Sequence, residues 1–165
     1  MTFPADILRQ AEQLLAAARA GQLKLATVES CTGGLVAGAL TEIAGSSDVV
    51  ERGFVTYANE AKTDMVGVPA ALIVQVGAVS EEVARAMAEG ALANAPVDLA
   101  VAITGVAGPG GGSPSKPVGL VHFACARRDR ATVHERHLFS GDRSDIRLAA
   151  VRVALALLEA GTRQA

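Results

Sequence analysis

The sequence predicts an α/β fold, a three-layer α/β/α arrangement around a mixed, mainly parallel five-stranded sheet. Short apolar runs, typical of buried strands, alternate along the chain with amphipathic helical patterns. Strand–helix–strand connections of this kind place neighbouring strands in parallel. Near the C-terminus two strand patterns are joined by only a few residues, which predicts a hairpin and therefore one antiparallel strand.

The elements of the first third of the chain follow from hydrophobic spacing. Residues 4–20 carry an apolar stripe at helical spacing and end at Gly21, a residue typical of helix ends. The apolar run 23–28 predicts a buried strand. It is followed by a helical pattern at 35–43 and a second strand at 49–57.

Capping residues mark three helices in the middle of the chain. Asn59 is a suitable cap for a short helix that carries Lys62 in its first turn, and Pro69 opens another short helix. Ser80 caps a longer helix, with two glutamates at the positive end of its dipole.

The last third predicts the centre and the far edge of the sheet. Residues 98–105 are apolar almost throughout, which predicts a central strand. A glycine- and proline-rich loop, 106–117, follows. The strand patterns 118–126 and 131–139 form the hairpin, and Asp142 caps a final amphipathic helix.

Size and composition limit the classes of function. The 165 residues, half of them hydrophobic, fit one domain, which we expect to span residues 1–165. A net charge of −2, one Tyr and no Trp argue against nucleic acid as a partner. No apolar run is as long as a membrane span, so we expect no membrane partner. Two distant cysteines fit the reducing cytoplasm better than a disulfide scaffold. The oligomeric state stays open, with a homo-oligomer as one alternative.

Polar residues follow each parallel strand. Ser30 comes after the first strand, Tyr57 and Lys62 after the second, and Thr104 after the third. Ligand sites of such sheets gather at the carboxyl ends of the parallel strands. We therefore expect these side chains to meet at one edge of the sheet.

The turn after the first strand offers a nucleophile and an anion site. Ser30 or Cys31 would be the nucleophile, and the N–H groups at the start of the next helix would stabilise an oxyanion or a phosphate. A Ser or Thr here is also a common helix cap, and a free Cys is often a small buried side chain. The residues expected to touch substrate at this turn are Cys31, Thr32, Gly33 and Gly34.

A serine nucleophile needs a base, and Lys62 is the stronger candidate. His122, His134 and His137 all fall on the predicted hairpin, where we interpret His134 and His137 as surface residues of an edge strand. Lys62 is one of three lysines in a chain whose other basic residues are arginines. To act near neutrality its pKa must fall from about 10.4 to roughly 7–8, which burial favours.

Several neighbours have alternative roles. Tyr57 would donate a hydrogen bond to Lys62 or to substrate, or pack at a strand end. Glu29 would orient a ligand, balance Lys62, or lie solvated at the strand end. The loop with Gly105 and Gly108 lets backbone N–H groups approach a ligand, and Arg143 would assist in holding a phosphate or simply sit at a helix start.

Six sequence blocks together resemble one family, the CinA C-terminal family. They are Glu29–Gly34, Arg52–Lys62, Gly77–Ser80, Thr104–Pro109, Lys116–Gly119 and Phe139–Arg143. The stand-alone members of that family are nicotinamide-nucleotide amidohydrolases. The resemblance implies hydrolysis of nicotinamide mononucleotide to nicotinate mononucleotide and ammonia in pyridine nucleotide salvage, with a small-molecule nucleotide as the partner and no cofactor or metal.

The resemblance also implies residue roles. Ser30 matches the family's nucleophile and Lys62 its general base, while Tyr57 and Thr104 match supporting catalytic positions. An amino-terminal domain of longer relatives is expected to be missing, together with its activity. Two alternatives stay open: a non-catalytic module that senses a nucleotide, related to competence- and damage-inducible proteins, and a hydrolase in which Cys31 is the nucleophile.

Overall fold

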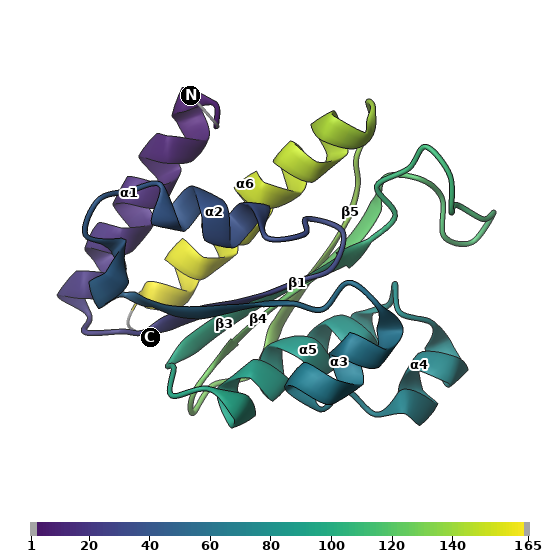
Figure 1. Cartoon of the computed structure of the whole chain (residues 1–165), viewed down its shortest axis with the longest axis horizontal. Coiled ribbons are helices and arrows are strands. Elements are labelled where there is room, and N and C mark those ends of the chain that lie inside the picture. Colours follow the sequence, from purple (N-terminus) through teal and green to yellow (C-terminus); the bar gives the residue numbers. More distant parts are fainter. Residues whose placement is uncertain (1–2, 164–165) are drawn as a thin grey trace.

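The computed structural model describes residues 3–163, and its centre is a five-stranded sheet of order β2-β1-β3-β4-β5 (Figure 1). Strand β1 pairs in parallel with β2 and β3, and β4 lies antiparallel between β3 and β5. Among the described residues β4 is thus the one antiparallel strand, and the predicted fold class is confirmed. The strands are β1 (Leu25–Glu29), β2 (Val50–Val55), β3 (Leu99–Gly105), β4 (Leu120–Arg127) and β5 (Val133–Leu138).

Helices cover both faces of this sheet (Figure 1). One layer comprises α1 (Ala5–Ala20), α2 (Leu35–Thr41) and α6 (Arg143–Thr162), and the other comprises α3 (Asn59–Val66), α4 (Ala70–Val76) and α5 (Glu81–Asn94). A short 3₁₀ turn, Ser46–Asp48, precedes β2. Within residues 3–163, no helix combines the length and the apolar character that crossing a bilayer requires.

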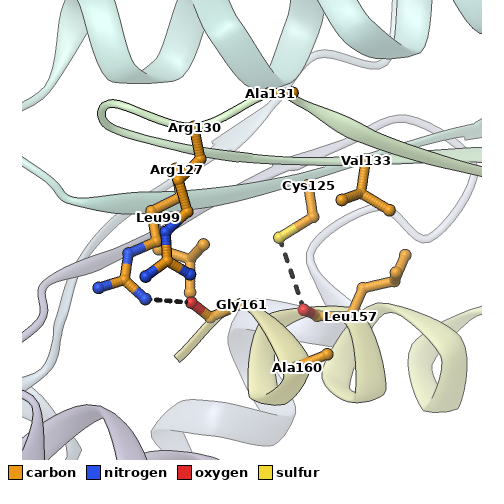
Figure 2. A pocket seen from close by; sticks show the side chains of 9 residues that line it. All are labelled: Leu99, Cys125, Arg127, Arg130, Ala131, Val133, Leu157, Ala160 and Gly161. Atoms are coloured by element: carbon orange, nitrogen blue, oxygen red, sulfur yellow. Dashed lines mark hydrogen bonds between the residues drawn. The ribbon is translucent and has the colours of Figure 1, made fainter. Parts of the chain in front are cut away.

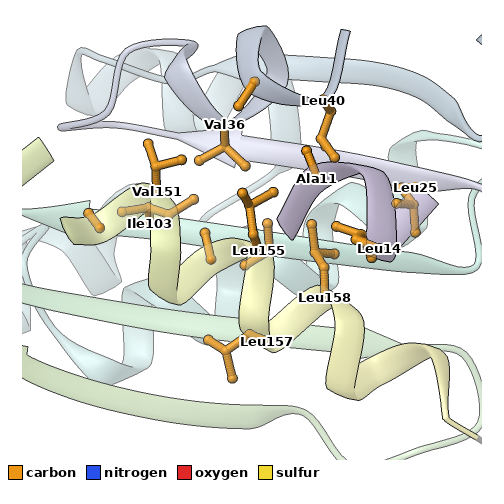
Figure 3. Packing of buried hydrophobic residues seen from close by; sticks show 14 of the residues in the cluster. Ala11, Leu14, Leu25, Val36, Leu40, Ile103, Val151, Leu155, Leu157 and Leu158 are labelled. Carbon is orange, nitrogen blue, oxygen red and sulfur yellow. The ribbon is translucent and has the colours of Figure 1, made fainter. Parts of the chain in front are cut away.

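The central strand β3 divides the hydrophobic core in two. Its larger residues, Leu99, Val101 and Ile103, face the layer of α1 and α6, where leucines of both helices interlock (Figure 3). Its alanines, Ala100 and Ala102, face α5. Because alternate side chains of a strand point to opposite faces, the run Leu-Ala-Val-Ala-Ile gives each helical layer its own surface.

Helix α5 crosses α3 at a glycine. A Cβ atom on Gly90 would lie 1.9 Å from the carbonyl oxygen of Val66, the last residue of α3. Such a distance is far inside van der Waals contact, so only glycine allows the two helices to pack this closely. The contact fixes the position of α3, the helix that carries Lys62.

Most of the predicted caps are confirmed. Ser80 Oγ accepts a hydrogen bond from Val83 N (3.3 Å), and Asp142 forms a capping box with Asp145 at the start of α6. The prediction for Asn59 was wrong. Asn59 is the first helical residue of α3, and Ala58 occupies the cap position with no side-chain hydrogen bond.

Two arginines at the turn between β4 and β5 bind the C-terminal ends of two helices. Arg128 donates to the carbonyl oxygens of Leu92 (2.8 Å) and Val97 (2.8 Å) at the end of α5. Arg127 donates to Gly161 O (2.6 Å) at the end of α6, beside a mostly apolar cavity of about 150 Å³ (Figure 2). Cationic groups at helix C-termini offset the negative end of the dipole. This cavity lies at the amino end of β3, opposite the predicted site, so we assign the arginines a structural role.

Candidate active site

The carboxyl ends of β1 and β3 and the segment after β2 border a cleft of about 300 Å³. Six residues predicted for the site line it, namely Ser30, Cys31, Tyr57, Gly105, Gly108 and Arg143. Sequence reasoning missed five further lining residues, Val79, Val106, Ala107, Gly110 and Gly111. Four of these belong to the predicted glycine loop. The glycine and proline content of the loop therefore predicted the segment, but it did not predict which of its residues line the cleft.

Ser30 and Lys62 meet at the bottom of this site. The Lys62 Nζ atom lies 3.2 Å from Ser30 Oγ, although the two residues stand on different elements. Lys62 is 1% exposed, and its Nζ also donates to Thr56 O (2.9 Å) and Tyr57 O (3.5 Å). The predicted juxtaposition of Ser30 and Lys62 is therefore present.

Burial lowers the pKa of Lys62. Loss of solvation disfavours the ammonium form, while the charges of Cys31 and Glu60 act in the opposite direction and more weakly. Among the described residues, no carboxylate forms an ion pair with Lys62. The surroundings thus shift the protonation equilibrium toward the neutral amine, which is the form able to accept a proton.

Glu29 has a role that none of the sequence alternatives contained. It is fully buried, and its carboxylate accepts hydrogen bonds from Val36 N (2.8 Å) and Ala37 N (3.1 Å) in the first turn of α2. The expectation of a solvated or ligand-orienting carboxylate was wrong. Because N–H groups at a helix start have no partner within the helix, a buried carboxylate aimed at them stabilises the helix end.

Helix α2 begins at Leu35, as predicted, and residues 31–34 form the turn that precedes it. Gly33 and Gly34 have φ of 58° and 100°, which glycine adopts without strain. Gly33 N donates to Ser30 O (3.0 Å) and Leu35 N to Thr32 O (3.1 Å). Within residues 3–163 the N–H groups of Cys31 and Thr32, the two residues that follow Ser30, donate to no acceptor in another residue.

The thiol of Cys31 does not have the properties of a nucleophile. Its side chain packs in the core and the residue is 7% exposed. Burial raises the pKa of Cys31 to about 11. No helix N-terminus lowers this pKa, because α2 starts four residues later and the N–H groups of Val36 and Ala37 in its first turn bind Glu29.

We expect iodoacetamide to alkylate Cys31 slowly near pH 7, because little thiolate is present and the sulfur is buried. We also expect Cys31→Ala to keep the amidase activity that the family resemblance implies within about tenfold of wild type, since a residue that only packs contributes through positioning. Mass spectrometry of the treated protein and the kcat of the variant check this. Rapid alkylation accompanied by inactivation, together with an inactive Cys31→Ala, would restore Cys31 as the nucleophile.

Tyr57 and Arg143 form one side of the mouth of the cleft. The Tyr57 residue is 60% exposed, and its hydroxyl oxygen accepts a hydrogen bond from Arg143 Nη2 (3.2 Å). Arg143 Nη1 donates to Gly108 O (2.7 Å) in the glycine loop. It is the backbone oxygen of Tyr57, and not the predicted hydroxyl, that contacts Lys62. Both side chains therefore lie at the exposed border of the cleft.

Thr104 lies beneath the cleft. It is 1% exposed, and its hydroxyl donates to Ala78 O (2.8 Å) next to the lining residue Val79. Lys116 Nζ donates to Val76 O (2.6 Å) in the same segment. These contacts hold one wall of the cleft in place.

Among the described residues, no histidine bonds Ser30 or lines the cleft. His122 Nδ1 lies 2.9 Å from His134 Nε2, and His134 also faces Glu81 at 3.6 Å. His134 lies on the edge strand β5, as interpreted, where its partly buried ring is stacked on the ring of His122. His137 contacts Glu135 (2.7 Å). Among residues 3–163, Lys62 is thus the basic side chain bonded to Ser30.

Solved structures and curated proteins resemble this chain over nearly its full length. A crystal structure of the competence/damage inducible protein CihA from Agrobacterium tumefaciens superposes with a TM-score of 0.96 at 51% identity, covering 99% of both chains. The nicotinamide-nucleotide amidohydrolase PncC of Escherichia coli K12 is 50% identical over 93% of each chain.

Longer relatives match as well. A CinA-like protein of Akkermansia muciniphila is 52% identical over 86% of this chain, but the match covers only 34% of that protein. The chain thus spans about a third of the length of this relative. The family described as the CinA C-terminal domain matches residues 8–161. With nearly the whole chain matched, the protein belongs to the CinA C-terminal domain family.

Proposed function

We propose that this protein is a hydrolase that converts nicotinamide mononucleotide into nicotinate mononucleotide and ammonia, in pyridine nucleotide salvage. The main support is the contact of 3.2 Å between Lys62 Nζ and Ser30 Oγ beneath an open cleft. Further support comes from the amidohydrolase PncC of E. coli, half of whose aligned residues are identical.

In the proposed mechanism, neutral Lys62 acts as the general base. A neutral amine has two N–H donors and one lone pair. The carbonyl oxygens of Thr56 and Tyr57 accept the two donors, and the lone pair then faces Ser30 Oγ. As Oγ attacks the carboxamide carbon, its proton passes to Nζ.

The remaining steps use the same groups. The oxyanion of the tetrahedral intermediate accepts hydrogen bonds from the N–H groups of Cys31 and Thr32. Protonated Lys62 gives its proton to the leaving nitrogen, and ammonia departs. Lys62 then deprotonates a water molecule that attacks the acyl-serine, and it returns this proton to Ser30 Oγ as the ester bond breaks. The carboxylic acid product ionises to the carboxylate, and both Ser30 and neutral Lys62 are regenerated.

The glycine loop and Arg143 are assigned to the rest of the substrate. Because the glycines of the loop, including Gly105 and Gly108, have no side chain, the backbone itself borders the cleft. Arg143 places a cation at the mouth of the cleft. A guanidinium suits a phosphate because it can donate two parallel hydrogen bonds. We propose that Arg143 contacts the phosphate and that Tyr57 positions the nucleotide.

The assay is ammonia release from nicotinamide mononucleotide by the wild-type protein, with chromatography of the product. We expect equal amounts of ammonia and nicotinate mononucleotide, and much slower reaction of free nicotinamide, which lacks the phosphate. Binding of the mononucleotide in calorimetry without any ammonia would contradict an amidase and support the sensing module instead.

A further inference from the structure

Arg147 contacts the turn that carries the proposed oxyanion donors. It lies one helical turn after Arg143 on α6 and is half-buried. Its Nε donates to Cys31 O (3.1 Å) and its Nη2 to Thr32 O (3.0 Å). One guanidinium thus binds two successive carbonyl oxygens immediately after Ser30.

The peptide geometry gives this contact a consequence on the other side of the turn. In a trans peptide the C=O and the following N–H point in opposite directions. Because Cys31 O faces Arg147, the N–H of Thr32 in the same peptide points away from the guanidinium. That N–H has no acceptor within residues 3–163.

A positive charge at the carbonyl also changes the donor strength of the peptide. A charge-assisted hydrogen bond to the oxygen draws electron density from the amide and makes its N–H a better donor. The second contact, at Thr32 O, fixes the next peptide. Its N–H belongs to Gly33 and donates to Ser30 O, so the turn is held from both ends.

We infer that Arg147 is a positioning residue for catalysis, which rests on the proposed function: it orients and polarises the Cys31–Thr32 peptide so that the Thr32 N–H stabilises the oxyanion. Arg147 does not border the cleft and touches no substrate atom in this scheme. Its loss is therefore expected to lower kcat and to leave substrate binding almost unchanged.

The test compares Arg147→Met and Arg147→Lys with Arg152→Met. Arg152 lies on the same helix and pairs with Asp6 (2.6 Å) at the surface, so its variant controls for loss of a guanidinium from α6. We expect Arg147→Met to lower kcat for nicotinamide mononucleotide about 10²-fold, the order of one lost oxyanion donor, with KM changed less than about threefold. Arg147→Lys should lose about tenfold, because an ammonium cannot hold both carbonyls in a fixed fork.

The melting temperature and the pH profile of kcat distinguish a positioning role of Arg147 in catalysis from a role in protein stability alone. The expected result is a melting temperature of Arg147→Lys close to that of Arg152→Met and an unchanged acidic limb, since Lys62 is not affected. If Arg147→Met does not fold, the kcat and KM of Arg147→Lys are compared with those of Arg152→Met instead. An unchanged kcat in an active protein, or a loss seen entirely in KM, would overturn the inference. A wild type that releases no ammonia would overturn the proposed function and this inference with it.

Discussion

Lys62→Arg is expected to lower kcat for ammonia release from nicotinamide mononucleotide by about 10²–10⁴-fold, the usual contribution of a general base. The substitution keeps the positive charge, but a guanidinium does not lose its proton in proteins. The Nζ position is also enclosed, with Lys62 only 1% exposed, so a planar group of greater size cannot reproduce its contacts. Steady-state kinetics of the purified variant measure the effect.

Two further variants make this result specific. Lys24→Arg is the matched control, because Lys24 Nζ donates to Asp48 O (2.6 Å) at the surface and should tolerate the change. Ser30→Ala should lose at least as much activity as Lys62→Arg, and the double variant should lose little more, since groups that act as a unit are not additive. Substantial activity in Lys62→Arg would rule out Lys62 as the base.

The pH dependence has a defined sign. Burial places the pKa of Lys62 in the folded protein below its ordinary value of 10.5. As pH rises through that lowered value, the neutral amine forms, so activity should rise along an acidic limb that reports this pKa. Between the lowered value and 10.5 the unfolded chain binds more protons at Lys62, so this residue makes stability rise with pH in that window.

Gly90→Ala is expected to destabilise the fold by about 3 kcal/mol, at the upper end of ordinary overpacking. The added Cβ would meet the Val66 carbonyl at 1.9 Å, and a backbone atom cannot rotate away as a side chain can. Relief requires α3 to move off α5. Since α3 carries Lys62, we also expect kcat to fall by about tenfold or more. Denaturant unfolding and steady-state kinetics measure the two effects.

Gly38→Ala is the matched control for this substitution. Gly38 also lies within a helix, α2, where a new Cβ would meet the Phe3 ring at 3.4 Å, an ordinary contact. Alanine is favoured over glycine in helices by about 0.5–1 kcal/mol, so this variant should be neutral or slightly stabilised. Equal stability of the two variants would show that the crossing of α5 and α3 tolerates a methyl group.

The sequence was sufficient to predict the fold and the central pair of the site. Hydrophobic spacing marked each strand, and the order of strands and helices determined which strands run in parallel. Ser30 and Lys62 could be placed together because both follow parallel strands, whose carboxyl ends meet at one edge. The caps at Ser80 and Asp142 were predictable because they depend on residues within three positions.

Contacts between distant residues were not predictable in this way. Arg147 binds carbonyls 115 and 116 positions earlier in the chain, and nothing in its own neighbourhood marks that contact. Glu29 looks like a polar strand end in sequence, yet the turn 31–34 folds α2 back onto it and buries it completely. Both side chains bond backbone groups. Because almost every residue has the same backbone groups, the identity of the residues at those positions does not predict such contacts.

The arginines of the β4–β5 turn affect how the protein can be engineered. Exposed hairpin tips are usually the preferred places to insert a peptide tag or to open a chain for circular permutation. Here the tip joins two opposite layers, because Arg128 holds the end of α5 and Arg127 the end of α6. An insertion at this position would separate those anchors and loosen both layers, so the tip is a poor attachment point despite its exposure.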